Sequence, residues 1–246
     1  SVFFLESTFI SKNITELFEY CDMAITVGGD GTIIHAAKYA AKADKQLIGV
    51  NVGRLGFAAD VEPHEYEQLE RLLTGDYTTE ERILLDVEVI KEDGSKHYLA
   101  VNDAVVARGQ LSKTIDLHLT LDGDEISKYR ADGLLFSTPT GSTAYSLSAG
   151  GPILAPKMEC ILMTPVCPHS LFSRSVLFSG ESELSVHVKI PEECCCVLTI
   201  DGEKNVPVLA TDRVVIRKSD LKLKLALLHN RNFYKLLNEK LKERDF

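Results

Sequence analysis

Residues 28–32, Gly-Gly-Asp-Gly-Thr, are the first in the chain whose types and spacing could do chemistry. They place one carboxylate, Asp30, among three glycines, which can adopt φ above zero and leave the backbone open to a ligand. An apolar run of strand length, 23–27, comes before them, and an alanine-rich helical pattern, 33–41, comes after them. Backbone N–H groups at the start of a helix favour a phosphate. We therefore predict a phosphate-containing ligand beside Asp30.

A tight turn with Asp30 or Thr32 as the helix N-cap is the simpler interpretation of the same residues. A cap alone does not require three glycines, however, so we favour a ligand site. The pattern is not a P-loop, because no G-x-x-x-x-G-K-[ST] sequence occurs in the chain, and the dinucleotide fingerprint G-x-G-x-x-G is also absent. Asp30 should lie at the carboxyl end of a parallel strand, where α/β folds bind their ligands.

A second candidate is the stretch 132–152, which carries a series of Ser and Thr hydroxyls around Pro139 and Gly141. Short hydroxyl side chains donate and accept hydrogen bonds, so they suit sugar hydroxyls and phosphates. Tyr145 could support a base or a ribose. The alternative is a solvated Ser/Thr loop, but the fifteen residues 132–146, which combine Asp-Gly, Pro and Tyr, are unusual for such a loop.

Two shorter segments are weaker candidates. Asn102 and Asp103 could contact a purine edge or ribose hydroxyls, although an Asx-turn or a strand cap is the commoner role for such a pair. Residues 51–57, Asn-Val-Gly-Arg-Leu-Gly-Phe, end an apolar strand. There Arg54 and backbone amides could face a second phosphate group, or Arg54 could simply be exposed in a turn.

The first third of the chain, which holds the first and last of these segments, alternates short apolar runs with helical patterns. We expect strands at 2–5, 23–27 and 46–52, and helices at 14–20, 33–41 and 65–73. Such alternation with short loops predicts a parallel sheet with crossover helices.

The pattern changes near Thr78, and from Leu84 onward apolar residues alternate with polar ones. We expect half-buried strands at 85–89, 115–121, 184–188, 195–200, 214–216 and 221–227, separated by turn signals. Repeated strands of this kind predict an antiparallel sandwich, and 230–244 predicts a closing helix. We therefore expect an α/β domain with a parallel sheet, residues 1–80 with 229–246, and an all-β domain, residues 81–228.

The composition limits the classes of function. The 246 residues include 27 Lys and Arg against 36 Asp and Glu, a net charge of −9, which argues against nucleic acid or an anionic membrane as a partner. No apolar run approaches the ~20 residues of a membrane helix, and the first residues do not resemble a signal peptide. Six cysteines, three of them at 194–196, match no disulfide framework or metal pattern. We expect reduced thiols and a cytoplasmic protein.

Taken in order, the four segments resemble the NAD kinase family. Residues 28–32 match a motif that this family shares with diacylglycerol and sphingosine kinases and, more distantly, with phosphofructokinases. Residues 51–57 match its N-x-G-x-L-G-F segment, and Asn102 and Asp103 match its N-[ED] pair. Residues 132–152 match D-G-x-x-x-S-T-P-T-G-S-T-A-Y-S-x-S-x-G-G-P, which is specific to NAD kinases. The similarity spans nearly the whole chain.

The resemblance implies phosphorylation of the adenosine-ribose 2′-hydroxyl of NAD to give NADP, with Mg²⁺ and with ATP or polyphosphate as the donor. It also implies a site between the two domains, and a homodimer or homotetramer whose NAD pocket borrows residues from a neighbour. Asp30 would accept the proton of the attacking hydroxyl. No residue is implied as a metal ligand, and the residues implied for nucleotide binding are Asp30, Gly31, Asn102, Asp103, Lys113, Arg130, Asp132, Thr143, Ala144, Tyr145, Ser146, Leu147 and Ser148.

Two positions depart from the family pattern. Asp103 stands where Glu is commoner, and residues 201–203, Asp-Gly-Glu, have an acid where many relatives have Gln. Two other functions are considered. A lipid kinase of the diacylglycerol kinase type is disfavoured, because the segment around Tyr145 and the acidic composition suit a dinucleotide. A non-catalytic dinucleotide sensor would keep the pocket without turnover. The sequence leaves open ATP or polyphosphate as the donor and NAD or NADH as the acceptor.

Overall fold

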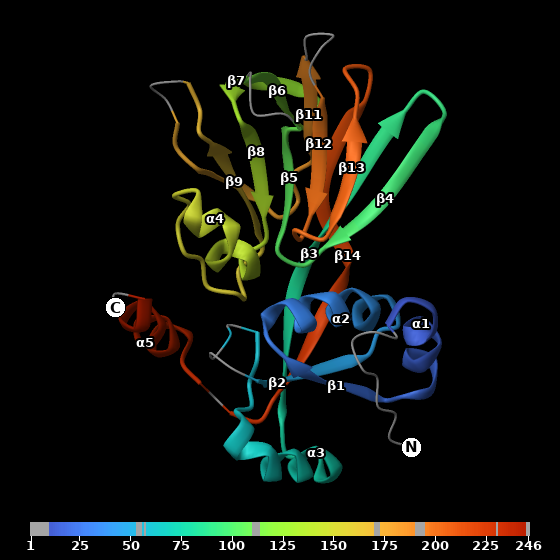
Figure 1. Ribbon diagram of the computed structural model, residues 1–246, viewed down its shortest axis with the longest axis vertical. Coiled ribbons are helices and arrows are strands. Elements are labelled where there is room, and N and C mark those ends of the chain that lie inside the picture. The colour runs from blue at the N-terminus through green and yellow to red at the C-terminus, as the bar shows by residue number, and fades with distance from the viewer. Residues whose placement is uncertain are drawn as a thin grey trace. The chain divides into compact units, whose positions relative to one another are not determined.

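Figure 1 shows the computed structural model of the chain. The structure describes residues 10–52, 56, 58–109, 114–169, 173–189, 195–229 and 231–244, without the side chains of 10–13 and 240–244. It divides into two compact units, Ser1–Arg82 with Leu221–Phe246, and Ile83–Asp220. We refer to them as the N-terminal unit and the C-terminal unit. The divisions fall within two long strands, β3 (Thr78–Lys91) and β14 (Arg213–Leu227). The domain limits expected from the sequence, 80/81 and 228/229, stay a prediction.

The N-terminal unit is an α/β unit, as the alternating pattern predicts. Strands β1 (Met23–Gly28) and β2 (Gln46–Asn51) are parallel, and the last part of β14 runs parallel to β2. Helix α2 (Asp30–Lys42) connects β1 to β2 (Figure 1). The other helical elements are α1 (Ile10–Tyr20), the 3₁₀ helix η2 (Pro63–Glu70), α3 (Arg71–Thr74) and α5 (Phe233–Arg244).

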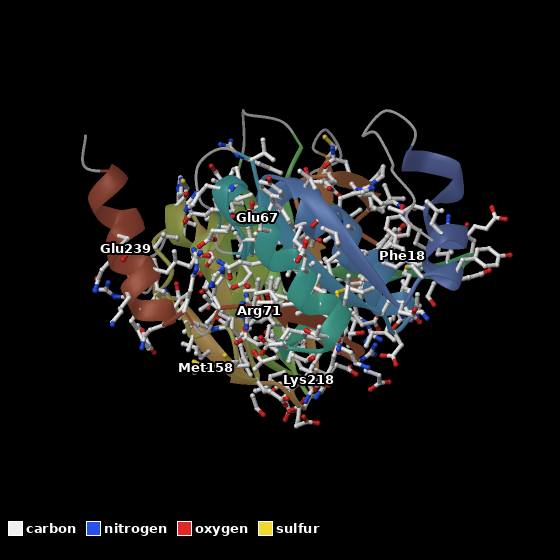
Figure 2. All side chains as sticks on the ribbon, turned by 90° about the horizontal axis from the view of Figure 1, so that it is seen from below. Phe18, Glu67, Arg71, Met158, Lys218 and Glu239 are labelled. Carbon is white, nitrogen blue, oxygen red and sulfur yellow. The ribbon has the colours of Figure 1, made fainter. Side chains whose placement is uncertain are left out.

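The small side chains of α2 let this helix lie close to the sheet. Its buried residues are Ile33, Ala36, Ala37, Ala40 and Ala41. On β2, a Cβ at Gly49 would lie 2.5 Å from Cδ1 of Ile33 and 3.1 Å from Cα of Ala59, so a side chain there would force its neighbours to shift. Helix α1 packs against α2 in turn, and its Phe18, labelled in Figure 2, is buried. The start of α2 is thereby fixed relative to the end of β1.

Helices η2 and α3 cover the other face of β2. Ile48 and Val50 cluster with Leu69 and Leu72 of these helices, whereas Gly49 faces α2. Because successive residues of a strand point to opposite faces, both faces of β2 are buried. This explains the apolar residues 47–50 within the strand expected at 46–52, a pattern typical of a parallel strand covered on both sides.

The C-terminal unit is a sandwich of two antiparallel layers, as the alternating pattern predicts. One layer has the order β10-β9-β8-β5-β12-β13, and the other contains β14-β11-β6-β7 with the β3–β4 hairpin. One core cluster includes Leu117 and Val186 from one layer and Leu134 and Leu198 from the other. The strands are β4 (Gly94–Ala100), β5 (Asp103–Arg108), β6 (Ile115–Leu121), β7 (Asp124–Ala131), β8 (Gly133–Ser137), β9 (Cys160–Val166), β10 (Val176–Ser179), β11 (Leu184–Lys189), β12 (Cys196–Ile200) and β13 (Lys204–Val208).

Three predicted elements differ from the structure. The strand expected at 2–5 lies outside the described residues. The helix expected at 65–73 begins earlier, as η2, and ends as α3. The two strands expected at 214–216 and 221–227 are one strand, β14, because its charged middle is matched by neighbouring carboxylates. Arg217, for example, pairs with Glu183 at 2.8 Å and with Glu88 at 3.0 Å.

Two predictions from composition can be compared with the described part of the chain. Its five cysteines, 21, 160, 167, 195 and 196, are free thiols. Burial raises the pKa of Cys196 to about 12, so this thiol stays protonated and unreactive. None of the described helices is long and apolar enough to cross a membrane.

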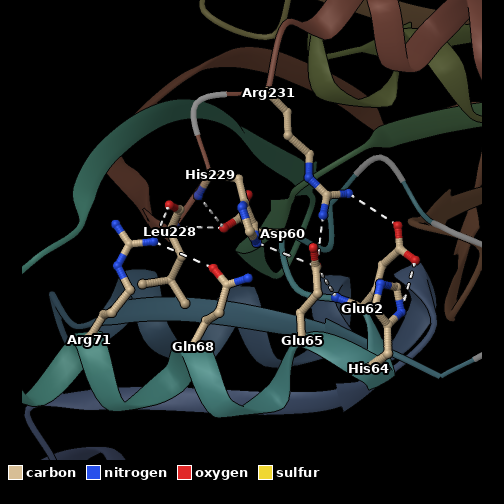
Figure 3. A network of polar contacts seen from close by, with 9 residues as sticks. All are labelled: Asp60, Glu62, His64, Glu65, Gln68, Arg71, Leu228, His229 and Arg231. Carbon is tan, nitrogen blue, oxygen red and sulfur yellow. Dashed lines mark hydrogen bonds and ion pairs between the residues drawn. The ribbon is translucent and has the colours of Figure 1, made fainter.

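A buried carboxylate, Asp60, ties the end of β14 to the segment that follows β2 (Figure 3). Its Oδ2 accepts the backbone N–H groups of Leu228 at 2.6 Å and His229 at 3.1 Å. Arg71 donates to the carbonyl of Leu228 at 2.9 Å. Burial raises the pKa of Asp60 above its ordinary value of 3.8, although the two backbone hydrogen bonds and the charges of His229 and Arg231 act in the opposite direction.

Replacing Asp60 by Asn should change how stability depends on pH. A carboxyl group with a raised folded-state pKa contributes stability below its unfolded-state pKa, and loses that contribution as the pH rises through the folded-state value. Asn does not titrate. The unfolding free energy of the wild-type protein minus that of Asp60→Asn should therefore fall as the pH rises above about 4, as measured by urea unfolding.

Asp76→Asn is a control of opposite sign. Arg71 donates to Asp76 at 2.8 Å and lowers the pKa of that carboxyl group. The wild-type protein should therefore gain stability over Asp76→Asn as the pH rises. The free energy of unfolding of the wild-type protein minus that of Asp60→Asn could instead rise with pH, as is expected for Asp76→Asn. That result would contradict the assignment of Asp60 as a carboxylate destabilised by burial.

Candidate functional site

Asp30 lies at the start of α2, directly after the parallel strand β1. β1 ends at Gly28, and Gly29 is the N-cap of the helix. The Oδ1 atom of Asp30 accepts the backbone N–H of Ala58 at 3.2 Å. The residue is only half-buried, so a ligand can reach the carboxylate. The expected position of Asp30, at the carboxyl end of a parallel strand, is confirmed.

Of the three glycines around Asp30, only Gly28 is required by a close contact, and none has a left-handed backbone. Gly28, Gly29 and Gly31 all lack the positive φ that the sequence analysis allowed for. A Cβ at Gly28 would lie 2.5 Å from Oγ1 of Thr32, whereas a Cβ at Gly29 or Gly31 would meet nothing within 4 Å. Gly29 forms the cap without a side-chain hydrogen bond, so the interpretation of Asp30 or Thr32 as N-cap is wrong. The backbone at the start of α2 is open to a ligand.

A buried arginine, Arg82, adds positive charge to this part of the N-terminal unit. It is 8% exposed and forms an ion pair with Glu80 at 2.7 Å. Burial lowers the pKa of Arg82, while the charges of Glu80 and Asp30 raise it. Because a guanidinium keeps its proton in proteins, Arg82 is a fixed positive charge in this unit.

In the C-terminal unit, Asp201 organises the turn that carries Asn102 and Asp103. Its carboxylate accepts the backbone N–H groups of Val101 at 3.0 Å, Asn102 at 2.7 Å and Asp103 at 3.0 Å. In return, the N–H of Asp201 donates to the carbonyl of Asp103 at 2.9 Å. The pair thus begins β5 with its N–H groups satisfied by a distant carboxylate.

Several hydroxyls in the stretch 137–146 point inward. Thr138 donates to the carbonyl of Val101 at 2.7 Å, and Ser142 donates to the carbonyl of Pro139 at 2.7 Å. Ser146 lies 3.2 Å from a second hydroxyl, on β9. All three Ser and Thr side chains are fully buried. These hydroxyls therefore build the loop, which differs from the expectation that the whole series faces a sugar or a phosphate.

The same loop packs directly on the turn at Asn102. A Cβ at Gly141 would lie 2.1 Å from the carbonyl oxygen of Asn102, so only glycine fits. The N–H of Thr138 donates to that carbonyl oxygen at 2.9 Å. The structure thus brings together two of the segments that the sequence analysis selected, the pair 102–103 and the stretch that begins at 132.

The residues after Gly141 offer the accessible surface of this loop. They form two short helices, η3 (Thr140–Thr143) and α4 (Tyr145–Ser148). The side chain of Tyr145 is 47% exposed. Ser148 is exposed as well, and the half-buried residues around them are Thr143, Ala144 and Leu147. Tyr145 is therefore available to stack on a planar group.

Asp132 and Arg130 lie elsewhere in the C-terminal unit. Asp132 pairs with Arg108 at 2.8 Å, at the far end of β5 from Asp103. The ends of this strand are about 17 Å apart in an extended chain. Arg130 pairs with Asp116 at 2.9 Å, and its hydrogen bond lowers the pKa of that carboxyl group. Within one chain, these residues do not join the group around Asn102.

Some predicted site residues cannot be placed. Lys113 and Arg54 lie outside the described residues, as do Gly53, Leu55 and Phe57. Their expected contacts with a nucleotide or a phosphate stay predictions. Among the residues that are described, no group of three or more His, Cys, Asp or Glu side chains could hold a metal ion.

Neither the roles of Asp201 and Arg82 nor the contact of Gly56 with Asp30 was expected from the sequence. Asp201 stands in an Asp-Gly pair, which signals a two-residue hairpin turn, and both of its residues have positive φ. The Asp-Gly pair therefore predicts the turn, but it does not predict which distant backbone N–H groups the carboxylate of Asp201 binds. Arg82 follows the charged residues of 80–81 and precedes an apolar run, so nothing in the local pattern marks it as buried.

Two family models match the chain. The model described as ATP-NAD kinase N-terminal domain matches residues 7–77. The model described as ATP-NAD kinase C-terminal domain matches residues 101–228. The first match contains Asp30, and the second contains the turn at Asn102 and the loop with Tyr145.

Curated relatives named NAD kinase match over most of their length. The protein from Natranaerobius thermophilus is 40% identical over 238 residues, which cover 96% of this chain and 82% of the relative. The protein from Cellvibrio japonicus is 42% identical over 228 residues, which cover 92% of this chain and 76% of the relative.

Solved structures of similar proteins share the fold. A yeast NADH kinase complexed with NADH has a TM-score of 0.79 at 28% identity, and the match covers 90% of this chain and 66% of the yeast chain. An NAD kinase from Archaeoglobus fulgidus in complex with ATP has a TM-score of 0.77 at 27% identity, over 93% of this chain and 85% of the other.

The turn at Asn102 should depend on the carboxylate of Asp201. Asp201→Ala leaves three backbone N–H groups without their charged acceptor, so the free energy of unfolding should fall by about 2–4 kcal/mol. Asp201→Asn keeps one acceptor oxygen and should cost less. Urea unfolding of the three proteins measures both effects.

Asp122→Ala is the matched control for this prediction. Asp122 has φ of 50°, close to the 48° of Asp201, so alanine meets the same backbone strain. Among the described residues, its carboxylate accepts one hydrogen bond, from the N–H of Glu183 at 2.9 Å. Equal losses of stability in Asp122→Ala and Asp201→Ala would mean that backbone strain, and not the three hydrogen bonds, sets the cost.

Proposed function

Because the chain belongs to the NAD kinase family, we propose that it transfers a phosphoryl group from ATP or polyphosphate to the adenosine-ribose 2′-hydroxyl of NAD, giving NADP. The observation that carries this proposal is the setting of Asp30. Its half-buried carboxylate accepts a hydrogen bond from the N–H of Ala58 and lies at the start of a helix where the backbone is open. A carboxylate held in this way can accept a hydroxyl proton, and an open helix start suits a phosphate.

In the proposed reaction, Asp30 takes the proton of the 2′-hydroxyl while the hydroxyl oxygen forms its bond to the transferred phosphorus. The bond from phosphorus to the donor's bridging oxygen breaks, and the leaving phosphate keeps the electron pair. Such transfers need in-line positioning and charge neutralisation more than covalent chemistry.

Magnesium fits the proposal as a companion of the donor. Mg²⁺ is usually held by one or two carboxylates together with substrate phosphates. The described residues contain no cluster that could hold a metal alone. We therefore propose that the donor phosphates provide most of its ligands, and that the ion neutralises their charge when bound.

Nucleotide recognition is proposed for the turn and the loop of the C-terminal unit. Asn102 and Asp103 would contact the ribose or the base through groups that Asp201 holds in place. Tyr145 would stack on a planar ring, with Thr143, Ala144, Leu147 and Ser148 beside it. The hydroxyl of Ser146 is engaged within the loop and the residue is fully buried, so we propose that Ser146 contributes by holding the loop in shape.

We also propose a homodimer or homotetramer. Asp132 and Arg130 lie at the far end of β5 from Asn102, too far to share one small ligand with it in the same chain. If a neighbouring protomer supplies Asp132, Arg130 and Lys113 to the pocket, both groups can contact one dinucleotide. This arrangement gives a reason for the two separate groups of predicted binding residues.

ATP is the donor that the comparisons favour, since the Archaeoglobus fulgidus NAD kinase was solved in complex with ATP. The yeast NADH kinase was solved with NADH, so NADH is kept beside NAD as an acceptor to be tested. A cytoplasmic location is proposed because the thiols of the described residues are free, and thiols persist in reducing compartments.

Asp30→Asn should lower turnover by about 10²–10⁴-fold, the usual contribution of a general base. Binding of NAD should be retained, because the amide keeps the size of the carboxylate. The assay uses saturating ATP, Mg²⁺ and NAD, and detects NADP with an NADP-specific dehydrogenase. Parallel reactions with polyphosphate or NADH identify the preferred donor and acceptor.

Asp22→Asn is the control, since Asp22 is an exposed carboxylate in the same unit, just before β1. It should keep wild-type turnover. Near-normal turnover of Asp30→Asn would remove the general-base role. Tight NAD binding by the wild-type protein without any NADP would favour the dinucleotide sensor over the kinase.

A further inference from the structure

We propose that Gly56 is a positioning residue for Asp30, an inference that rests on the proposed function. Gly56 has no side chain and touches no substrate in this proposal. Because it lacks a side chain, Gly56 leaves room for the carboxylate of Asp30. Any side chain at position 56 would displace that carboxylate from its hydrogen bond with Ala58, and turnover would fall although the fold remains.

The distances around Gly56 carry the proposal. A Cβ at this position would lie 1.7 Å from Oδ1, 2.5 Å from Cγ and 2.9 Å from Oδ2 of Asp30. The carboxylate therefore lies directly against the Cα of Gly56. Of the atoms that a Cβ would meet, the three nearest all belong to Asp30, so the close approach serves this one side chain.

Backbone conformation does not explain the glycine. The positive-φ glycines are 75, 94, 123, 150 and 202, and Gly56 is not among them. An alanine could therefore adopt the same backbone angles without the strain of the left-handed region. The contact with Asp30 is the remaining reason for glycine at this position.

The backbone N–H of Ala58 provides the hydrogen bond that holds the carboxylate of Asp30 in this position. This N–H donates to Oδ1 of Asp30 at 3.2 Å, which draws the carboxylate toward the backbone of this segment. The missing side chain of Gly56 permits the approach that this bond requires. The hydrogen bond and the empty space together limit the rotamers of Asp30.

The backbone after Ala58 is anchored, so it cannot easily retreat from an added methyl group. The N–H groups of Asp60 and Val61 donate to the carbonyl of Gly49 at 3.0 and 3.2 Å, and Asn51 donates to the carbonyl of Val61 at 2.8 Å. Asp60 is fixed further by its bonds to the end of β14. The Asp30 side chain can change its rotamer at less cost than this backbone can shift, so the side chain should move instead.

Gly56→Ala should therefore lower kcat by about 10²-fold, the cost of a displacement near 1 Å at a reacting group, while KM for NAD changes little. The decisive measurement is a double-mutant cycle with Asp30→Asn. If Gly56 acts through Asp30, then adding Gly56→Ala to Asp30→Asn should change kcat by less than about twofold. A general packing defect would lower kcat in both backgrounds.

Gly109→Ala is the matched control. A Cβ at Gly109 would lie 2.5 Å from Sγ of Cys195 and 3.2 Å from Cγ2 of Val197, so it also meets the ends of side chains, but in the other unit. It should keep wild-type kcat. Thermal unfolding of each variant separates loss of activity from loss of fold, and a crystal structure of Gly56→Ala should show Asp30 turned away from the N–H of Ala58.

Each outcome decides the proposal. Wild-type kcat in Gly56→Ala, equal losses in both backgrounds, an unfolded Gly56→Ala protein, or an unmoved Asp30 in its crystal structure would each overturn it. If the wild-type protein forms no NADP, the proposed function fails. The position of Asp30 in the Gly56→Ala crystal then still decides the role of Gly56.

Discussion

The carboxylate of Asp30 lies in the space that a side chain at position 56 would fill, and it accepts a hydrogen bond from the backbone of Ala58. The rest of the N-terminal unit keeps this contact in place. Alanines on α2 and Gly49 on β2 let the helix lie close to the sheet, which fixes where Asp30 begins the helix. Asp60 fixes the segment beyond Ala58 by binding two backbone N–H groups at the end of β14. A half-exposed carboxylate is thus held by parts that are themselves buried.

The C-terminal unit uses the same physical device for a different purpose. Asp201 binds three consecutive N–H groups, as Asp60 binds two, and in both cases a carboxylate holds the backbone of a distant segment. Around that turn, the hydroxyls of Thr138 and Ser142 donate hydrogen bonds to backbone carbonyls and so stabilise the loop itself. The loop in turn presents Tyr145 to solvent. The buried polar side chains of this loop stabilise its backbone, and its exposed side chains are the ones that a ligand can contact.

The periodicity of the sequence was enough to predict the two kinds of unit and part of their strands, whereas β4, β5, β7, β8, β9, β10 and β13 were not predicted. The mainly apolar segment 46–52, buried on both faces, and the alternation at 115–121, buried on one, gave strands close to β2 and β6. The position of Asp30 also followed from sequence, because a glycine-rich turn between a strand and a helix has few possible placements. The contacts of Asp201 and Gly56 did not, since each joins residues far apart in the chain. Local patterns likewise could not tell inward hydroxyls from outward ones.

The most direct test of the proposed chemistry is a crystal structure of the protein with NAD bound, in which one distance is measured. A carboxylate oxygen of Asp30 should lie about 2.6–3.2 Å from the 2′-oxygen of the adenosine ribose, the reach of a general base. A dinucleotide bound with that hydroxyl away from Asp30, or an Asp30 side chain turned away from the ribose, would contradict it.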